Sequence, residues 1–450
     1  MELRCRYGNW ALIAVSLSLT SCAVEEPALP TSGEGVTGVT SSRAAFVVQG
    51  QELVTTQGKR YLRMTDDLVK RWRSDPGLEG DYSDQHPAVQ AFLERVRAHQ
   101  LATRPVDQLS DEELADALRP VLHVDEGVFL AADGDVPVVK AMRALKGKSV
   151  KLAESYSPSG NYDIYFGKHH GQPTHGCCGT DDRWAVGANT AWPYATVIAS
   201  FNVCNIFSSN WGNDLWCQNG SNVYSRDCTW QLIGHSTAIA AAHCFYDTAA
   251  NKYLPCFEDG YGPFCRYRWG AAPDASDNAM QPIPPGYPTL WAGYSMQVPF
   301  LWYQATDPYL AIQYDYAVID FTGYAIPNPG YTAGWVGWGV LNNSDTLNSM
   351  YQIWGVPKTD FYDTPYSTWP RIRGSTAIRY PSSVSTYVTY TPGDVSAGNS
   401  GTGLIQYVNV WGGWYVTGTI TSYENNTCCA RARRLESTYL SFIQSASTEY

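Results

Sequence analysis

Hydrophobic and polar positions change their spacing along the chain, and the change divides it at about residue 155. From there onward, aromatic residues, Gly, Pro, Ser and Thr become frequent and charged residues become scarce. Short β-prone runs separated by turn residues predict an all-β barrel or sandwich. The runs that we expect to form strands cover residues 195–201, 237–242, 316–321, 387–390, 403–410 and 415–421.

Residues 52–145 instead carry dense charge, no cysteine and apolar positions at helical spacing. Ser110, with Glu113 three residues later, forms a capping box ahead of one such run. Another run follows Pro87, which suits a first helical turn, and consists of Val89, Phe92, Leu93 and Val96. We therefore expect a separate, mostly helical N-terminal region over residues 52–165. It is either an accessory domain or a pro-segment that assists folding or blocks an active site.

The first residues have the pattern of a targeting segment, because Arg4 and Arg6 precede the apolar run 10–19 and small residues follow. The stretch Leu-Thr-Ser-Cys22 resembles a bacterial lipobox, in which Cys22 would carry the lipid. An ordinary secretory signal with an incidental cysteine is the alternative. Ala23 after Cys22 resembles the address of an outer-membrane lipoprotein.

Residues 1–22 are thus expected to be a lipoprotein-type signal peptide, and residues 23–51, rich in Pro, Gly, Ser and Thr, a linker. The chain would be exported, either as an outer-membrane lipoprotein or released, and would meet a membrane only through the lipid. A net charge of −11 argues against nucleic acid as a partner. An even number of cysteines in an exported protein predicts disulfides, and ten lie beyond the signal: Cys177, Cys178, Cys204, Cys217, Cys228, Cys244, Cys256, Cys265, Cys428 and Cys429.

Candidate chemistry begins with the stretch 393–403, whose Gly and small polar residues predict a loop. Ser400 lies in it, within Gly398-Asn-Ser-Gly401. A nucleophilic serine needs such a setting, with little bulk around its hydroxyl and backbone N–H groups that can turn toward an oxyanion. By itself the stretch could equally be an ordinary turn.

A second stretch, the apolar run 237–242, leads into His243 and Cys244. The histidine would then lie at a strand end, where Cys228 can pair with Cys244 and fix the corner. A histidine held in this way can serve as a general base. A structural or metal-binding histidine is the alternative.

Asp315 opens a third stretch, the apolar run 316–319. A carboxylate there would be partly buried and could accept a hydrogen bond from the second ring nitrogen of a histidine, which fixes the tautomer of the ring and stabilises its charged form. Asp320, at the other end of the run, is the competing candidate. We prefer Asp315 because the apolar residues follow it directly. Either carboxylate could instead only mark a strand end.

The order His243, Asp315, Ser400 and the sequences around them, Ala-Ala-His-Cys, Asp-Tyr-Ala-Val-Ile and Gly-Asn-Ser-Gly, resemble the chymotrypsin-like serine proteases. The resemblance implies an all-β fold, a double six-stranded β-barrel with its barrels in residues 166–325 and 326–450. The mostly helical N-terminal region would precede it. The family also ends in a helix, and helical spacing recurs here at Leu435, Tyr439, Phe442, Ile443 and Ala446.

The same resemblance assigns roles to the three residues. Ser400 would attack a peptide carbonyl, His243 would take its proton and pass it to the leaving amine, and Asp315 would hold His243. The N–H groups of Gly398 and Ser400 would stabilise the oxyanion. The implied substrates are proteins or peptides; we expect no cofactor, no metal and a monomer.

Finer features resemble the bacterial branch that includes the glutamyl endopeptidases. These are Asp181-Asp-Arg183 ahead of Val186, the stretch 354–357, and Asn399. The trypsin branch has Asp at the position of Asn399, where it receives the new N-terminal amine on activation. Asn cannot form that ion pair, so the usual activation switch should be absent.

The residue preference at the cleavage site stays open. Asp394, six residues before Ser400, resembles the pocket-floor residue that gives trypsin its preference for Arg and Lys. Glutamyl endopeptidases use a histidine beside the pocket, and no histidine follows His243 in this chain. Other residues expected to bind substrate are Val395, Ser422 and Tyr423, with Glu424 next, where a small residue would be usual.

Two alternatives remain. A cluster ahead of the first barrel, made of His169, His170, His175, Cys177 and Cys178, could bind zinc, but oxidising surroundings favour a linker with its cysteines in disulfides. The function we predict is that of an exported serine endopeptidase. The alternative function is that of a catalytically idle homologue that acts as a cell-surface binding protein.

Overall fold

The computed structural model divides the chain into two units, residues 1–41 and 42–450, and all the residues that it describes lie in the second. These are residues 46–65, 68, 81–124, 127–157, 184–185, 192–193, 196–203, 224–244, 246–247, 252–253, 265–268, 295–305, 307–321, 329–355, 373–374, 380–395, 399–423 and 429–450. Among them, no helix is long and apolar enough to cross a membrane.

The first sheet is antiparallel and has eleven strands, in the order β1-β2-β3-β5-β4-β14-β15-β10-β9-β8-β13. Five of them precede the predicted barrel: β1 (Phe46–Gln49), β2 (Glu52–Thr55), β3 (Arg60–Arg63), β4 (Pro120–Val124) and β5 (Gly127–Ala131). The other six of the eleven are β8 (Val197–Val203), β9 (Tyr224–Leu232), β10 (Thr237–Ala240), β13 (Cys265–Arg268), β14 (Ser295–Pro299) and β15 (Ala317–Asp320).

The second sheet follows the order β19-β20-β23-β22-β21-β17-β18-β7, and β16 joins it by pairing with β22 and with β6. Its longer strands are β16 (Trp338–Val340), β17 (Met350–Gly355), β20 (Val388–Asp394), β21 (Gly403–Val408), β22 (Gly413–Tyr423), β23 (Cys429–Arg434) and β6 (Val150–Ala153). The two-residue strands are β7 (Trp184–Ala185), β18 (Arg373–Gly374) and β19 (Ser383–Val384), and a separate hairpin joins β11 (Tyr246–Asp247) to β12 (Lys252–Tyr253).

Helices lie at the places where the apolar spacing predicted them. In α2 (Pro87–Ala98), proline opens the first turn and the four predicted apolar side chains are buried. The capping box of Ser110 and Glu113 starts α3 (Asp111–Ala117). The chain closes with α9 (Ser437–Ala446), as predicted. Within the described residues, the other α-helices are α4 (Val136–Arg143), α5 (Pro308–Tyr314), α6 (Pro329–Ala333) and α7 (Asn343–Asn348), and the 3₁₀ turns are η1 (Leu101–Thr103), η2 (Val106–Gln108), η5 (Ala242–Cys244), η7 (Phe300–Tyr303) and η8 (Asn409–Trp411).

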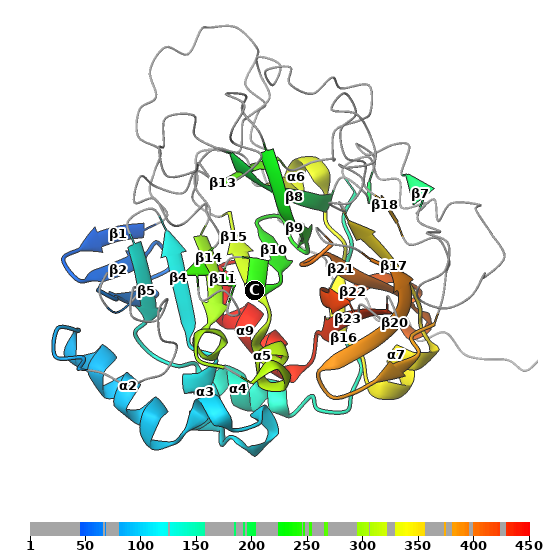
Figure 1. Cartoon of the computed structure of the whole chain (residues 1–450). Coiled ribbons are helices and arrows are strands. Elements are labelled where there is room, and N and C mark those ends of the chain that lie inside the picture. The colour runs from blue at the N-terminus through cyan, green and yellow to red at the C-terminus, as the bar shows by residue number, and fades with distance from the viewer. Residues whose placement is uncertain are drawn as a thin grey trace, which may run out of the picture. The chain divides into compact units, whose positions relative to one another are not determined.

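The N-terminal region, described over residues 46–157, contains more than the predicted helices. Six short strands, β1 to β6, accompany α2, α3 and α4, and β1 lies inside the stretch that we expected to be a linker. Strand β4 pairs with β14, so this region and the predicted first barrel share one sheet. In Figure 1 the blue and cyan strands of this region lie beside the green strands of that barrel.

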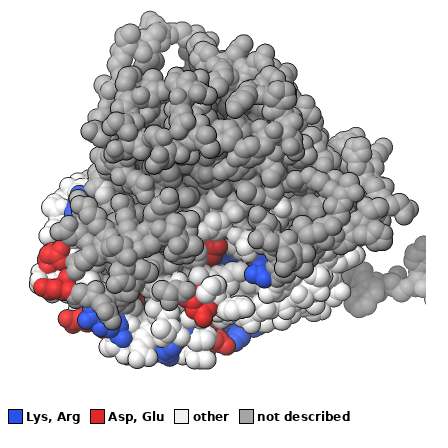
Figure 2. Space-filling model, viewed as in Figure 1, with Lys and Arg blue, Asp and Glu red and all other residues white. Residues whose placement is uncertain are grey.

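Many charged residues of the N-terminal region form ion pairs with one another. Ion pairs within the region join Arg95 to Asp116, Arg104 to Glu113 and Arg143 to Asp111. Figure 2 shows acidic and basic side chains interspersed on the described part of the face that it presents. The charge pattern is therefore that of a solvated, mixed surface.

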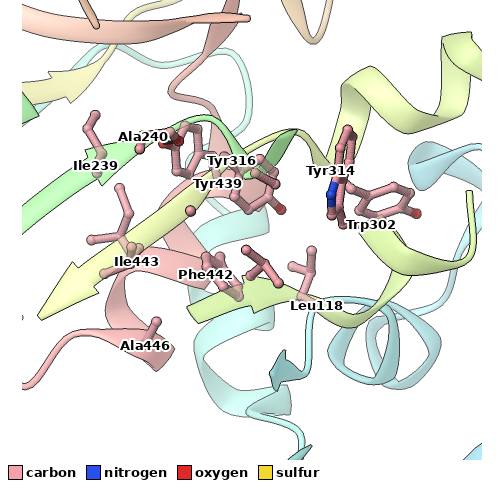
Figure 3. Packing of buried hydrophobic residues seen from close by; sticks show 14 of the residues in the cluster. Leu118, Ile239, Ala240, Trp302, Tyr314, Tyr316, Tyr439, Phe442, Ile443 and Ala446 are labelled. Atoms are coloured by element: carbon pink, nitrogen blue, oxygen red, sulfur yellow. Dashed lines mark hydrogen bonds between the residues drawn. The ribbon is translucent and has the colours of Figure 1, made fainter. Parts of the chain in front are cut away.

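The core lies where the first sheet meets α9. Tyr316, just before β15, stacks on Tyr439 of α9 with ring centroids 4.1 Å apart. Phe442 of α9 meets the ring of Tyr316 edge-on (Figure 3). Leu118, from the N-terminal region, belongs to the same cluster. Two sheets, antiparallel except for the pairing of β16 with β22, and a closing helix fit the chymotrypsin-like double β-barrel that the sequence motifs predicted.

Candidate active site

The histidine corner is built by β9, β10 and the 3₁₀ turn η5. Strand β10 ends at Ala240, and His243 follows in the middle of η5. A disulfide between Cys228 of β9 and Cys244, with their Cα atoms 5.8 Å apart, ties this turn to the sheet, as the sequence suggested. The cross-link holds the backbone on the C-terminal side of His243.

Asp315 lies at the C-cap of α5, where the chain passes into β15. Because β15 pairs with β10 in the register Ala240↔Ala317, the carboxylate comes to the end of β10 that leads to His243. Asp315 is buried, and its two oxygens accept from one residue: Oδ1 from the backbone N–H of His243 at 2.9 Å, Oδ2 from Nδ1 of its ring at 2.8 Å. This contact places the ring proton on Nδ1 and leaves Nε2 as the basic nitrogen.

A buried ion pair between Arg433 and Glu436 contacts the residues that flank Asp315. The guanidinium of Arg433, on β23, donates to Glu436 at 2.7 Å and to the carbonyl oxygen of Gln313 at 3.0 Å. It also lies 5.1 Å from the ring centroid of Tyr316. Burial by itself would lower the pKa of Arg433. The attraction of Glu436 and of the nearby tyrosine hydroxyls is larger, so the net effect is a raised pKa and Arg433 stays charged. Residues on both sides of Asp315 are thus fixed to the second sheet.

Removing this arginine should cost stability. We expect Arg433→Met to lower the free energy of unfolding by about 3–5 kcal/mol, because Glu436 would remain buried without its partner. Chemical denaturation with circular dichroism measures the change. The exposed surface pair of Lys140 and Glu112 provides the control, and Lys140→Met should leave the free energy of unfolding nearly unchanged. Equal losses in the two variants would contradict the structural role given to Arg433.

The Ser400 loop rests on β9 beside the disulfide. The carbonyl oxygen of Ser400 accepts from the backbone N–H of Thr229 at 2.8 Å, and the N–H of Gly401 donates to Ile420 at 2.7 Å. At Gly401 φ is +86°, and a Cβ there would lie 2.2 Å from the Thr229 carbonyl oxygen and 3.3 Å from Sγ of Cys244. Glycine is therefore required at this position by both its backbone angle and the space around it.

All three sequence motifs accordingly reach the same place. Thr229 is next to Cys228, whose disulfide holds the turn that carries His243, and the same Thr229 binds the backbone of Ser400. The side chain of Ser400 is partly exposed. The backbone of the Ser400 loop therefore lies against the strand whose disulfide holds the His243 turn, and Asp315 contacts His243 in that turn.

The predicted specificity residues are only partly described. Asp394 ends β20 and pairs through its backbone with Cys429; Val395 is buried; and Ser422, partly exposed on β22, is paired with Arg431. Outside the described residues lie Gly398, Cys22, the histidine and cysteine cluster 169–178, and the side chains of Asp394 and Tyr423.

Sequence reasoning missed Arg433 and Glu436. A charged side chain is read as exposed unless a partner is known, and two of the rings that contact this arginine, Tyr316 and Tyr387, come from distant parts of the chain. The nearest signal was the spacing of three residues between the two charges.

Comparisons with known proteins find similarity to proteins that carry the names of proteases. No family model matches the chain. A protein named extracellular metalloprotease, from Bacillus subtilis (strain 168), is 26% identical over 226 residues, which are 50% of this chain and 58% of that protein. A solved Glu endopeptidase in complex with MPD is 18% identical with a TM-score of 0.39, covering 60% of this chain and 97% of its own. The protease Anisep from Arthrobacter nicotinovorans is 13% identical with a TM-score of 0.33, covering 56% and 95%.

The name of the Bacillus relative raises the question of a metal. In the described part of the chain, one group of metal-type side chains lies close together: Cys228, His243 and Cys244. Both sulfurs are bonded to each other, and Nδ1 of the histidine is held by Asp315, so this donor set does not fit a metal ion. The described chain has a chymotrypsin-like fold, as its strand order, its closing helix and its three motifs together indicate. The Bacillus, Glu endopeptidase and Anisep proteins all carry the names of proteases.

Proposed function

We propose that the protein is a serine endopeptidase with the triad His243, Asp315 and Ser400. The observation that carries the proposal is the two-point contact of Asp315 with His243, through the backbone N–H and through ring Nδ1. That contact orients Nε2 for proton transfer and stabilises the imidazolium that forms.

The reaction would proceed through an acyl-enzyme. Oγ of Ser400 bonds to the peptide carbonyl carbon while its proton passes to Nε2 of His243. The C–N bond then breaks, and the same proton moves to the leaving amine. In the second half, a water molecule attacks the acyl carbon and gives a proton to Nε2 of His243. The bond between the acyl carbon and Oγ then breaks, and His243 passes that proton to Oγ, which restores the Ser400 hydroxyl and releases the acid product. The N–H groups of Gly398 and Ser400 would stabilise the oxyanion, each contributing roughly 3 kcal/mol.

Export belongs to the same proposal. A charged and then apolar start of the chain, with Cys22 in a lipobox-like setting, would deliver the enzyme outside the cytoplasm. Its substrates would be proteins or peptides met there, and it would act as a monomer. Asp394 remains the candidate for setting the residue preference, with Arg or Lys as the side chain that it would receive.

The catalytic class is tested by inhibition of the unmodified protein. We expect hydrolysis of a mixed peptide library to persist in a metal chelator and to stop after reaction with a fluorophosphonate, because Ser400 and not a metal-bound water would be the nucleophile. Loss of activity in chelator alone, restored by zinc, would overturn the serine assignment. A folded protein that neither cleaves nor reacts would support the idle binding homologue.

A further inference from the structure

The N-terminal region supplies five strands, β1 to β5, to the first sheet and one strand, β6, to the second. Strand β4 pairs with β14 from Met296↔His123 to Pro299↔Pro120, and the other edge of β14 pairs with β15, which begins two residues after Asp315. At the other end of the region, β6 pairs with β16, which itself lies against β22 of the second sheet. One continuous stretch of chain therefore connects both sheets.

Its contacts with the first sheet are buried and specific. Phe92 of α2 meets Phe300 edge-on with ring centroids 4.6 Å apart, and both rings are fully buried. The guanidinium of Arg119 covers Phe92 at 4.5 Å, while its carbonyl oxygen accepts from the N–H of Phe300 at 3.0 Å. The N–H of Val106 donates to Oε1 of Gln313, in the helix that ends at Asp315. The support of Asp315 thus includes the N-terminal region.

The end of α9 is held by the hairpin of β2 and β3. Lys59 is half-buried, and its Nζ donates to the carbonyl oxygens of Ser445 at 2.8 Å and Ser447 at 2.9 Å. Burial lowers its pKa. Tyr61 donates to Gln297, whose own side chain donates to the carbonyl oxygen of Ala446 at 2.6 Å. These bonds satisfy carbonyl groups that the last turn of a helix leaves without partners.

Contacts with the second sheet come from the residues around β6. The carbonyl oxygen of Glu154 accepts from the indole of Trp335 at 2.9 Å, and its carboxylate accepts from the hydroxyl of Tyr415 at 2.8 Å. Ser155 accepts from the N–H of Gly337 at 2.8 Å. None of the contacts named for the N-terminal region is made by the side chains of His243, Asp315 or Ser400.

We infer that the N-terminal region is a permanent strap between the two sheets, and not an inhibitory pro-segment that is discarded. The inference rests on the proposed function, in which His243 and Asp315 come from the first sheet and Ser400 lies in the loop that enters the second. A triad of this kind must be held to about 0.5 Å by its supporting structure. Loss of the region would leave β14 as an exposed edge and uncover the apolar residues around Phe300.

A strap and an inhibitor predict different changes in the rate at which a fluorophosphonate inactivates the protein when the N-terminal region is loosened. We expect Lys59→Met to lower the melting temperature by about 2–6 °C, because two charge-assisted hydrogen bonds are lost. We also expect that its rate of inactivation by a fluorophosphonate does not rise. The adjacent Arg60→Met is the matched control, since the exposed Arg60 pairs across the surface with Glu52 of the same hairpin. A rate at least tenfold above wild type in Lys59→Met alone would mean that the region inhibits, and would overturn the inference.

A second measurement uses the unmodified protein. After labelling, the active enzyme should contain residues 46–157 in a one-to-one ratio with the rest; if the chain has been cut, the two parts should co-elute in native gel filtration and separate only in denaturant. A fully active, labelled enzyme that lacks this region would contradict the strap.

Hydrogen exchange tests the strap separately from the proposed serine endopeptidase function. Failure of the full chain to react with the fluorophosphonate would count against the proposed function, not against the strap. In that case the amides of β4 and β14 should still lose protection together, in one cooperative opening. Exchange of β4 long before β14 would contradict the strap whether or not the protein reacts.

Discussion

Replacement of Asp315 by Asn is expected to lower kcat by about 10⁴-fold, with little change in the fold. An amide has the shape of the carboxylate but can donate from only one side and accept from the other. Its NH₂ group would face Nδ1 of His243, so the ring would change tautomer and carry its proton on Nε2. A ring in that state cannot take the proton of Ser400. Steady-state kinetics on a peptide ester measures the loss.

Asp320→Asn is the matched control, because both carboxylates are buried and flank the same strand. Asp320 accepts from the backbone N–H of Thr448 at 2.9 Å and from its hydroxyl at 2.6 Å. We expect a loss of about 1–3 kcal/mol in stability and a change in kcat below about tenfold. If the two variants exchanged these effects, the acidic member of the triad would be Asp320.

Replacement of Ser400 by Ala is expected to lower kcat by about 10⁶-fold, since no other group in the triad can form the acyl-enzyme. Stability should not change, because the bond from Thr229 reaches the carbonyl oxygen of Ser400, which alanine retains. Ser441→Ala is the control: this buried serine of α9 donates to Ser437 at 2.8 Å. Its kcat should equal that of the wild type. Activity that survives in Ser400→Ala would exclude this serine as the nucleophile.

Local patterns predicted the elements that are defined by local sequence. Proline at the first turn of α2, the capping box of α3 and the apolar face of α9 are each visible within a few residues. The strands of the N-terminal region were missed because they have only four or five residues, too few for an alternating pattern to stand out. The strands that join the region to the rest of the fold also have remote partners, as in the pairing of Val121 with Val298 and of Val150 with Val340.

The candidate site also combines residues that local sequence predicts with supporting residues that only the fold reveals. His243, Asp315 and Ser400 each lie in a short motif, and the order of the three motifs is what resembles the chymotrypsin-like proteases. What holds them there could not be read locally. Arg433 depends on rings from Tyr316, Tyr387 and Tyr439, and Gly401 is required because Thr229 approaches it from β9.

The most direct test of the proposed triad is the position of a covalent adduct. The full chain should be treated with a fluorophosphonate, digested and mapped by mass spectrometry. We expect one added phosphonyl group, on Ser400, with formation that depends on His243 because the free hydroxyl is a weak nucleophile. No adduct on Ser400 in a protein that still hydrolyses peptides, or an adduct that forms equally well in His243→Ala, would contradict the triad.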